Sequence, residues 1–165
     1  MGNILTEERE KQVLELCKDL ITLKSYSGEE EAVAKKLESI FKEIGYDDVF
    51  TDSYGNVIGH IKGKNKGESI LFDGHMDTVP AGDTSKWTKD PFGAEVEDGK
   101  IYGRGATDMK GPLAAMIYAA SYFAEDTKKD FSGDIYVAAV VHEECFEGIA
   151  PRKVSKRVKP NYVVI

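Results

Sequence analysis

The sequence predicts an α/β fold, a three-layer α/β/α sandwich with a mixed central sheet. Two amphipathic helix patterns open the chain, strand patterns separated by turn residues follow, and a further helix pattern stands between strand patterns. Such an order places helices on the faces of a sheet that combines parallel and antiparallel pairs. The 165 residues, 41% hydrophobic and 31% charged, are enough for one soluble domain with a real core.

Three helices are predicted from apolar spacing and capping residues. Residues 7–23 form the first, with Thr6 as N-cap and apolar residues at helical spacing. Ser27 and Glu30 fit a capping box for the second helix. The third covers residues 112–124 and is apolar on almost all sides, so we expect it to be buried on several of them.

Strand patterns alternate with turn residues. They cover residues 49–51, 56–62, 69–72, 94–96, 100–102, 135–141 and 162–165. The first two flank a hairpin turn, and Asp98-Gly99 is a strong tight-turn sequence for a second hairpin. The continuous apolar run 135–141 suits the middle of a sheet. The sequence stops within the last strand pattern, so we expect a larger protein cut short.

Charge and cysteine usage restrict the class of protein. A net charge of −7 argues against binding to nucleic acid or to anionic membranes. No apolar run approaches a membrane span, and residues 1–23 lack a signal-peptide core. Cys17 and Cys145 are too few for a disulfide framework, so we expect a cytoplasmic location. We interpret the basic run 153–159 as a solvated helix face.

Three acid-bearing stretches carry the functional prediction. His75 and Asp77 follow a strand and face the same side, where the acid can accept a ring N–H and strengthen the other nitrogen as a metal ligand. Asp108 stands in a glycine-rich loop before a helix, either as a cap or as a carboxylate aimed into a site. Glu143 and Glu144 end a core strand, where one acid can bind metal while the other stays free as a base.

Each stretch also has a purely structural explanation. A histidine satisfied by hydrogen bonds, a plain helix cap and a solvated strand end account for them one at a time. Together they favour a metal site, because open α/β sheets place ligands at the carboxyl ends of strands. Imidazole and carboxylate ligands suit Zn2+, with Co2+ or Mn2+ as alternatives.

The motifs GHMDTVP, GRGATDMKGPLAAM and HEE resemble those of the co-catalytic zinc aminoacylase and carboxypeptidase family. This family includes acetylornithine deacetylase and succinyl-diaminopimelate desuccinylase. The form HEECFEG is similar to a branch named for selenium-metabolism hydrolases. The resemblance implies an incomplete zinc-peptidase-like fold, in which residues 1–165 are the N-terminal portion of the catalytic domain. The lid and dimerisation domain and the C-terminal part of the catalytic domain would be absent.

The resemblance also implies roles for five residues. His75 and Glu144 would each bind one of two zinc ions, Asp108 would bridge them, and Asp77 would orient His75. Glu143 would act as general base, taking a proton from the shared water and passing it to the leaving amine. A cis peptide bond directly after Asp108 is implied as well.

The full-length parent would be a cytoplasmic homodimer that hydrolyses small peptides or N-acyl amino acids. By resemblance, each metal lacks one ligand in these 165 residues, so we expect the piece alone to bind metal weakly and to be inactive. Two alternatives are a non-catalytic module that binds a partner or metal weakly, and a zinc aminopeptidase on a similar sheet.

Other residues receive structural assignments. We expect His142 to lie outside the ligand set and His60 to be exposed. Cys145 is predicted to be a small buried side chain rather than a ligand, and Cys17 to lie in the helix core. Trp87 either lines the approach to the site or packs against Phe92.

Overall fold

The computed structural model describes residues 5–146 and 148–165 and confirms the α/β class. The helices are α1 (Glu7–Thr22), α2 (Glu31–Glu43), α3 (Gly111–Asp126) and α4 (Ile149–Val158). The strands are β1 (Asp48–Thr51), β2 (Val57–Lys62), β3 (Ile70–His75), β4 (Glu95–Glu97), β5 (Lys100–Tyr102), β6 (Asp134–Val140) and β7 (Tyr162–Val164). Two short helical turns, η1 (Thr84–Lys86) and η2 (Ala106–Lys110), complete the described elements.

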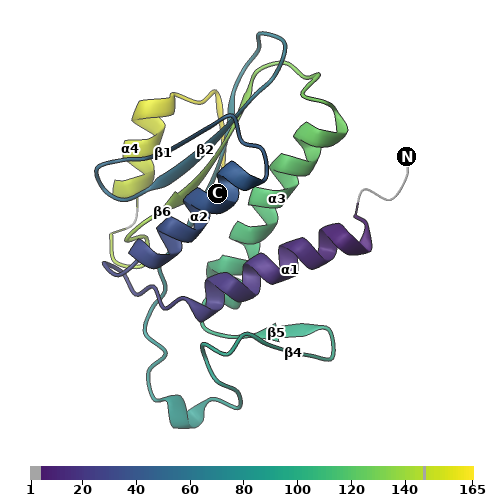
Figure 1. Cartoon of the computed structure of the whole chain (residues 1–165). Helices are drawn as coiled ribbons and strands as arrows, with labels where there is room; N and C mark the ends of the chain where they lie inside the picture. The colour runs from purple at the N-terminus through teal and green to yellow at the C-terminus, as the bar shows by residue number, and fades with distance from the viewer. Residues whose placement is uncertain (1–4, 147) are drawn as a thin grey trace.

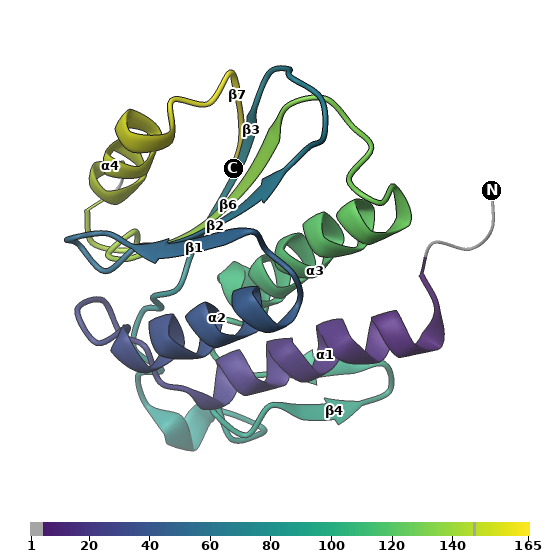
Figure 2. The ribbon, with the colours of Figure 1, turned by 45° about the horizontal axis from the view of Figure 1, so that its top comes forward.

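The central sheet is mixed, as predicted. Its five strands run in the order β1-β2-β6-β3-β7, and β4 and β5 form a separate hairpin. β1, β2 and β6 pair antiparallel, whereas β3 lies parallel to both β6 and β7. Helices α1, α2 and α3 lie on one side of the sheet and α4 on the other, and the β4-β5 hairpin lies beyond α1 (Figures 1 and 2).

The first helix begins as predicted and the second does not. Thr6 caps α1 by accepting a hydrogen bond from the Arg9 N–H at 3.3 Å. The predicted capping box is wrong, because α2 begins after Glu30 with no side-chain cap. The Ser27 hydroxyl instead donates to Asp77, and the Glu30 carboxylate accepts hydrogen bonds elsewhere. Ser27 is bound to the distant Asp77, and Glu30 to Gly28 and to the distant His142, rather than to their own helix.

The core lies between the sheet and the three helices on its larger face. Gly59 of β2 allows this close packing, since a Cβ there would lie 2.5 Å from Tyr46 Cδ1 and 2.9 Å from Phe41 Cδ1. Cys17 is buried in this core, as predicted. The third helix is only partly enclosed, because Phe123 on its outer face is 47% exposed.

β3 extends beyond its predicted strand pattern, which ended at residue 72, and includes two titratable residues, Asp73 and His75. It pairs with β6 as far as His75, which stands opposite Val140. Gly74 faces α3, where a Cβ would lie 2.6 Å from Met116 Cε. By strand alternation Asp73 and His75 face the opposite side, and both are buried.

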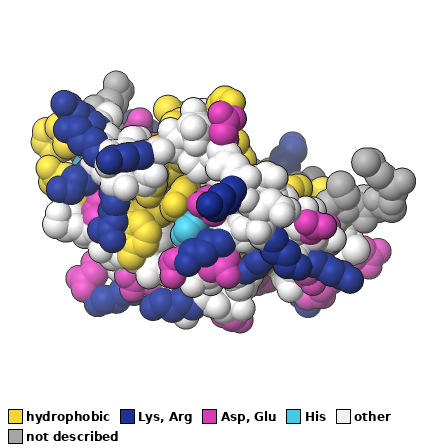
Figure 3. Space-filling view, turned by 90° about the horizontal axis from the view of Figure 1, so that it is seen from above, with side chains coloured by type: hydrophobic (Ala, Val, Ile, Leu, Met, Phe, Trp, Pro, Cys, Tyr) yellow, Lys and Arg dark blue, Asp and Glu magenta, His cyan; other side chains and the backbone are white. Residues whose placement is uncertain are grey.

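The basic run near the end of the chain lies on α4. The Arg157 guanidinium covers the Phe50 ring at 4.0 Å, and the Lys153 ammonium lies 5.4 Å from the Tyr54 ring centroid. Lys and Arg side chains alternate with Asp and Glu on the face seen in Figure 3, so both signs of charge intermix there. No helix in the described ranges combines the length and the apolar character needed to span a bilayer.

Candidate metal centre

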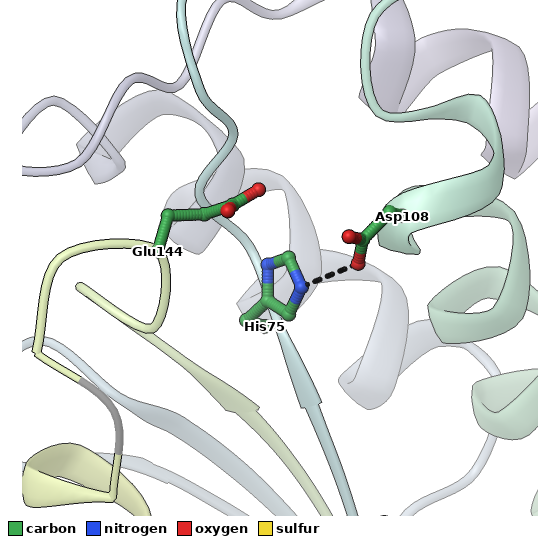
Figure 4. A group of neighbouring side chains, drawn as sticks. All are labelled: His75, Asp108 and Glu144. Atoms are coloured by element: carbon green, nitrogen blue, oxygen red, sulfur yellow. Dashed lines mark hydrogen bonds and ion pairs between the residues drawn. The ribbon is translucent and has the colours of Figure 1, made fainter.

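Three side chains that are distant in sequence converge at the carboxyl ends of β3 and β6. His75, Asp108 and Glu144 each offer one ligand atom, and these atoms lie within 4.8 Å of one another. His75 ends β3, Asp108 lies in η2, and Glu144 follows β6 (Figure 4). His75 Nε2 is 2.8 Å from Asp108 Oδ1. The structure thus brings together the three residues expected as metal ligands.

Asp108 reaches the site through an irregular turn. Its φ and ψ of −124° and 100° are not helical, and the Asp108-Met109 peptide is cis, as the resemblance implied. Gly105 opens the turn with φ of 80°, and a Cβ there would lie 2.7 Å from Thr78 Cγ2. The turn therefore needs glycine at this position to approach the segment after β3.

The orientation of His75 differs in one contact from the expectation. Its Nδ1 lies 2.9 Å from the main-chain carbonyl oxygen of Asp77 and 3.6 Å from the Asp77 carboxylate. A carbonyl only accepts, so Nδ1 carries the proton and Nε2 faces Asp108. Asp77 does hold the ring, but through its main chain rather than through its side chain.

The Asp77 carboxylate has a different set of partners. It is fully buried and accepts hydrogen bonds from the Ser27 hydroxyl at 2.7 Å and from the main-chain N–H groups of Glu143 and Glu144 at 3.0 and 3.1 Å. Both of its oxygens are therefore occupied by donors. The carboxylate fixes the main chain that carries the two glutamates, a role that no local sequence pattern indicates.

Glu143 lies beside the cluster. Its Oε2 is 3.7 Å from His75 Nε2, and its side chain is 36% exposed. Burial raises the pKa of Glu143, the nearby His75 opposes this, and the charges of Glu144, Asp77 and Asp108 raise the pKa further. A carboxyl group whose pKa is raised and that points at the cluster is suited to exchange a proton there.

His75 experiences opposing influences. Burial lowers its pKa, but the hydrogen bonds to Asp108 and to the Asp77 carbonyl, with the negative charges of Glu143 and Asp77, outweigh burial and raise the pKa overall. A raised pKa favours a second ring proton, which would sit on Nε2 and face Asp108. A divalent cation would compete with this second proton for Nε2. One imidazole nitrogen and two carboxylate oxygens that lie within 4.8 Å of one another are a donor set whose chemistry fits such a cation.

Asp73 is a further acid next to the site. It lies two residues before His75 on the same face of β3, is 3% exposed, and its Oδ1 has no hydrogen-bond partner among the described residues. Burial raises its pKa to about 7, an effect that His75 reduces and Glu143 increases. The three motifs indicate no role for Asp73, although its spacing from His75 places it on the same face of β3.

The remaining histidines lie outside the cluster. The His142 side chain is 41% exposed, as expected of a residue outside the ligand set. His60 is not exposed as predicted, because it stacks on Tyr136 with ring centroids 4.3 Å apart and lies between Asp48 and Asp134. Aromatic stacking across β2 and β6 covers the His60 ring.

Two further predictions are resolved by the structure. Cys145 is exposed rather than buried, because it lies in the loop after β6 instead of in the strand. Trp87 donates from Nε1 to the Ala81 carbonyl at 2.9 Å and lies under the Arg104 guanidinium. Phe92 makes its aromatic contact with Tyr26, not with Trp87.

Residues 71–164 match the model of peptidase family M20/M25/M40, a segment that contains all five predicted site residues. The chain belongs to this family, which confirms the resemblance inferred from the three motifs. It is 41% identical over 117 residues to a succinyl-diaminopimelate desuccinylase of Cereibacter sphaeroides (strain ATCC 17025), covering 70% of this chain and 31% of the relative. It is 38% identical over 133 residues to succinyl-diaminopimelate desuccinylase 2 of a Ruegeria species (strain TM1040), covering 79% and 33%.

Solved structures share the fold at lower identity. Human carnosine dipeptidase 1 superposes with a TM-score of 0.80 at 23% identity, covering 96% of this chain and 39% of that one. The Bacillus subtilis YXEP protein, a dinuclear metal binding peptidase from the M20 family, has a TM-score of 0.70 at 21% identity, covering 96% and 42%. The chain thus spans about a third of the length of the curated relatives described above.

Proposed function

We propose that this chain carries part of the active site of a metal-dependent hydrolase that cleaves amide bonds in small peptides or N-acyl amino acids. The observation that carries the proposal is the convergence of His75, Asp108 and Glu144 at the ends of β3 and β6. Membership of a peptidase family, desuccinylases among the relatives and a neighbour named as a dinuclear metal binding peptidase all support it.

The proposed roles combine the group of three donors with the roles that the family resemblance implies. His75, Asp108 and Glu144 would hold two divalent cations, zinc in the first place and Co2+ or Mn2+ as alternatives, with Asp108 shared between them. When bound, such cations polarise an amide carbonyl and lower the pKa of water. Glu143 lies outside the group of three ligands and its pKa is raised, so its carboxylate would take a proton and deliver it to the leaving amine.

The described residues offer fewer donors than two catalytic cations require. A catalytic zinc usually has three protein ligands, and within residues 5–146 and 148–165 only His75, Asp108 and Glu144 form such a group. We therefore propose that residues 1–165 act as the N-terminal portion of a longer catalytic domain, bind metal weakly and do not turn over substrate alone. A cytoplasmic homodimer is the proposed form of a family-length protein.

Cobalt titration tests the metal site. We expect the wild-type chain to develop visible Co2+ absorption bands that His75→Ala abolishes. His60→Asn is the control, because this histidine lies in β2 outside the ligand group, and we expect the variant to bind Co2+ as wild type does. Wild-type-like Co2+ binding by His75→Ala contradicts the proposed site.

A hydrolysis assay tests the second part of the proposal. The chain is incubated with Zn2+ or Co2+ and a panel of dipeptides and N-acyl amino acids, N-succinyl amino acids included. We expect no turnover above the metal-only background. Turnover that Glu143→Gln removes would show that these residues suffice for catalysis and would refute the proposed need for further ligands.

A further inference from the structure

The loop that carries the two site glutamates is held by side chains instead of by a strand partner. β6 ends at Val140, and each of the next four main-chain N–H groups donates to a side-chain oxygen. Val141 donates to Asn56 Oδ1 at 3.0 Å, His142 to Glu30 Oε1 at 3.0 Å, Glu143 to Asp77 Oδ1 at 3.0 Å and Glu144 to Asp77 Oδ2 at 3.1 Å.

The three acceptor residues are buried and come from separate parts of the chain. Glu30 is 5% exposed, and Asn56 and Asp77 are fully buried. They lie immediately before α2, immediately before β2 and shortly after β3. Chain segments that are far apart in sequence therefore meet at residues 141–144. Their side chains accept the main-chain hydrogen bonds that a neighbouring strand would accept if β6 continued.

Each acceptor is itself held in place. Asn56 donates from its amide to Asp52 Oδ2 at 2.9 Å, and Glu30 Oε1 also accepts from the Gly28 N–H at 3.0 Å. Asp77 accepts from the Ser27 hydroxyl at 2.7 Å. A side chain with a second fixed contact has few rotamers left, so its oxygen stays at one position relative to the loop.

We call the three acceptors Glu30, Asn56 and Asp77, with their hydrogen bonds to residues 141–144, the clamp. The backbone conformation of His142 depends on it. His142 has φ of 57°, in the left-handed region that only a few per cent of non-glycine residues adopt, histidine among the more frequent of them. This turn sends the chain from β6 toward the cluster, and the bond from its N–H to Glu30 Oε1 closes onto a buried carboxylate. If that acceptor is lost, residue 142 is free to return to negative φ, which redirects Glu143 and Glu144.

We propose that Glu30 and Asn56 are positioning residues that, together with Asp77, fix residues 141–144 and thereby set the distance of Glu143 and Glu144 from His75. The inference rests on the proposed function for its consequence, namely metal affinity. Its structural part, the clamp itself, does not depend on metal.

Substitutions at Glu30 test the clamp in the whole chain. Glu30→Ala removes the acceptor, Glu30→Gln keeps an acceptor oxygen without the charge, and Glu30→Asp keeps the charge but withdraws it by one methylene. Glu29→Ala is the matched control, because Glu29 is the exposed neighbour. The readouts are amide hydrogen exchange followed by NMR without metal, and the Co2+ dissociation constant.

We expect Glu30→Ala and Glu30→Asp to accelerate exchange at the His142 amide at least tenfold, while amides in the middle of β6 exchange as in wild type. We also expect the Co2+ dissociation constant of both variants to rise about tenfold, with Glu30→Gln restoring most of the affinity and Glu29→Ala matching wild type. If Glu30→Ala does not fold, Glu30→Asp decides the result.

Unchanged exchange at the His142 amide in Glu30→Asp overturns the inference. So does a loss of protection spread evenly over β6, because it shows a general loss of stability. If the wild-type chain binds no Co2+, the proposed function fails, while the exchange pattern still decides whether the clamp exists.

Discussion

Asp73 allows a direct test of how burial in the sheet shifts the pKa of an acid beside the site. The Asp73 side chain is 3% exposed, and its Oδ1 lacks a hydrogen-bond partner among the described residues. Burial raises its pKa from the ordinary value of 3.8 to about 7, with His75 opposing and Glu143 adding to the effect. Asp73→Asn keeps the shape of the side chain and removes its ability to ionise.

The sign of the effect follows from proton linkage. Between pH 3.8 and about 7 the native state holds the Asp73 proton while the unfolded chain has released it, so the free energy of unfolding falls as the pH rises. The full difference corresponds to roughly 4 kcal/mol once the carboxyl is ionised in both states. Between pH 5 and pH 8 the change amounts to about 2 to 3 kcal/mol.

The assay is urea unfolding of wild type and Asp73→Asn at several pH values between 5 and 8, with a chelator present so that no cation contributes. We expect the advantage of Asp73→Asn over wild type to grow by about 2 to 3 kcal/mol across this range. Asp98→Asn, at an exposed aspartate in the β4-β5 turn, serves as the control and should follow wild type at every pH. A constant difference between Asp73→Asn and wild type would refute the reasoning.

Three further predictions concern stability. Gly59→Ala should lower the free energy of unfolding in urea by about 1 to 3 kcal/mol, because its Cβ would lie 2.5 Å from Tyr46 Cδ1. Thr6→Ala should cost about 1 kcal/mol in thermal or urea unfolding, since it removes the N-cap of α1. Lys110 is buried against the Leu23 carbonyl with its pKa lowered to about 8, so wild-type stability should rise from pH 8 to 10.5, whereas that of Lys110→Met should not.

The sequence predicted elements well where a local pattern coincides with the final packing. The β1-β2 and β4-β5 hairpins follow from turn residues between alternating strands, and the central position of β6 follows from its continuous apolar run. The prediction from sequence failed where the same local pattern is compatible with two different sets of hydrogen bonds. Ser27 and Glu30 satisfy a capping box on paper, but in the structure they bind Asp77 and His142.

The candidate site shows the same division. The residue types of the three motifs predicted which side chains meet, because strand ends in an open sheet converge. They did not predict that the Asp77 carbonyl rather than its carboxylate contacts His75. They also did not predict that Cys145 would be exposed, since the length of β6 decides this and β6 ends before it. Such details depend on tertiary contacts that periodicity does not encode.

The acidic residues at and near the site fall into two groups, according to whether their carboxylate oxygens accept hydrogen bonds from main-chain N–H groups. Asp77 and Glu30 are buried, and their oxygens accept hydrogen bonds from main-chain N–H groups, which offset the cost of burying their charge. Among the described residues, no main-chain N–H donates to the carboxylates of Asp108, Glu143 or Glu144, so their lone pairs remain available. Carboxylates clustered without donors repel one another unless a cation or a proton lies between them. This distribution of donors, rather than the number of acids, separates the residues that shape the site from those proposed to hold a cation or to move a proton.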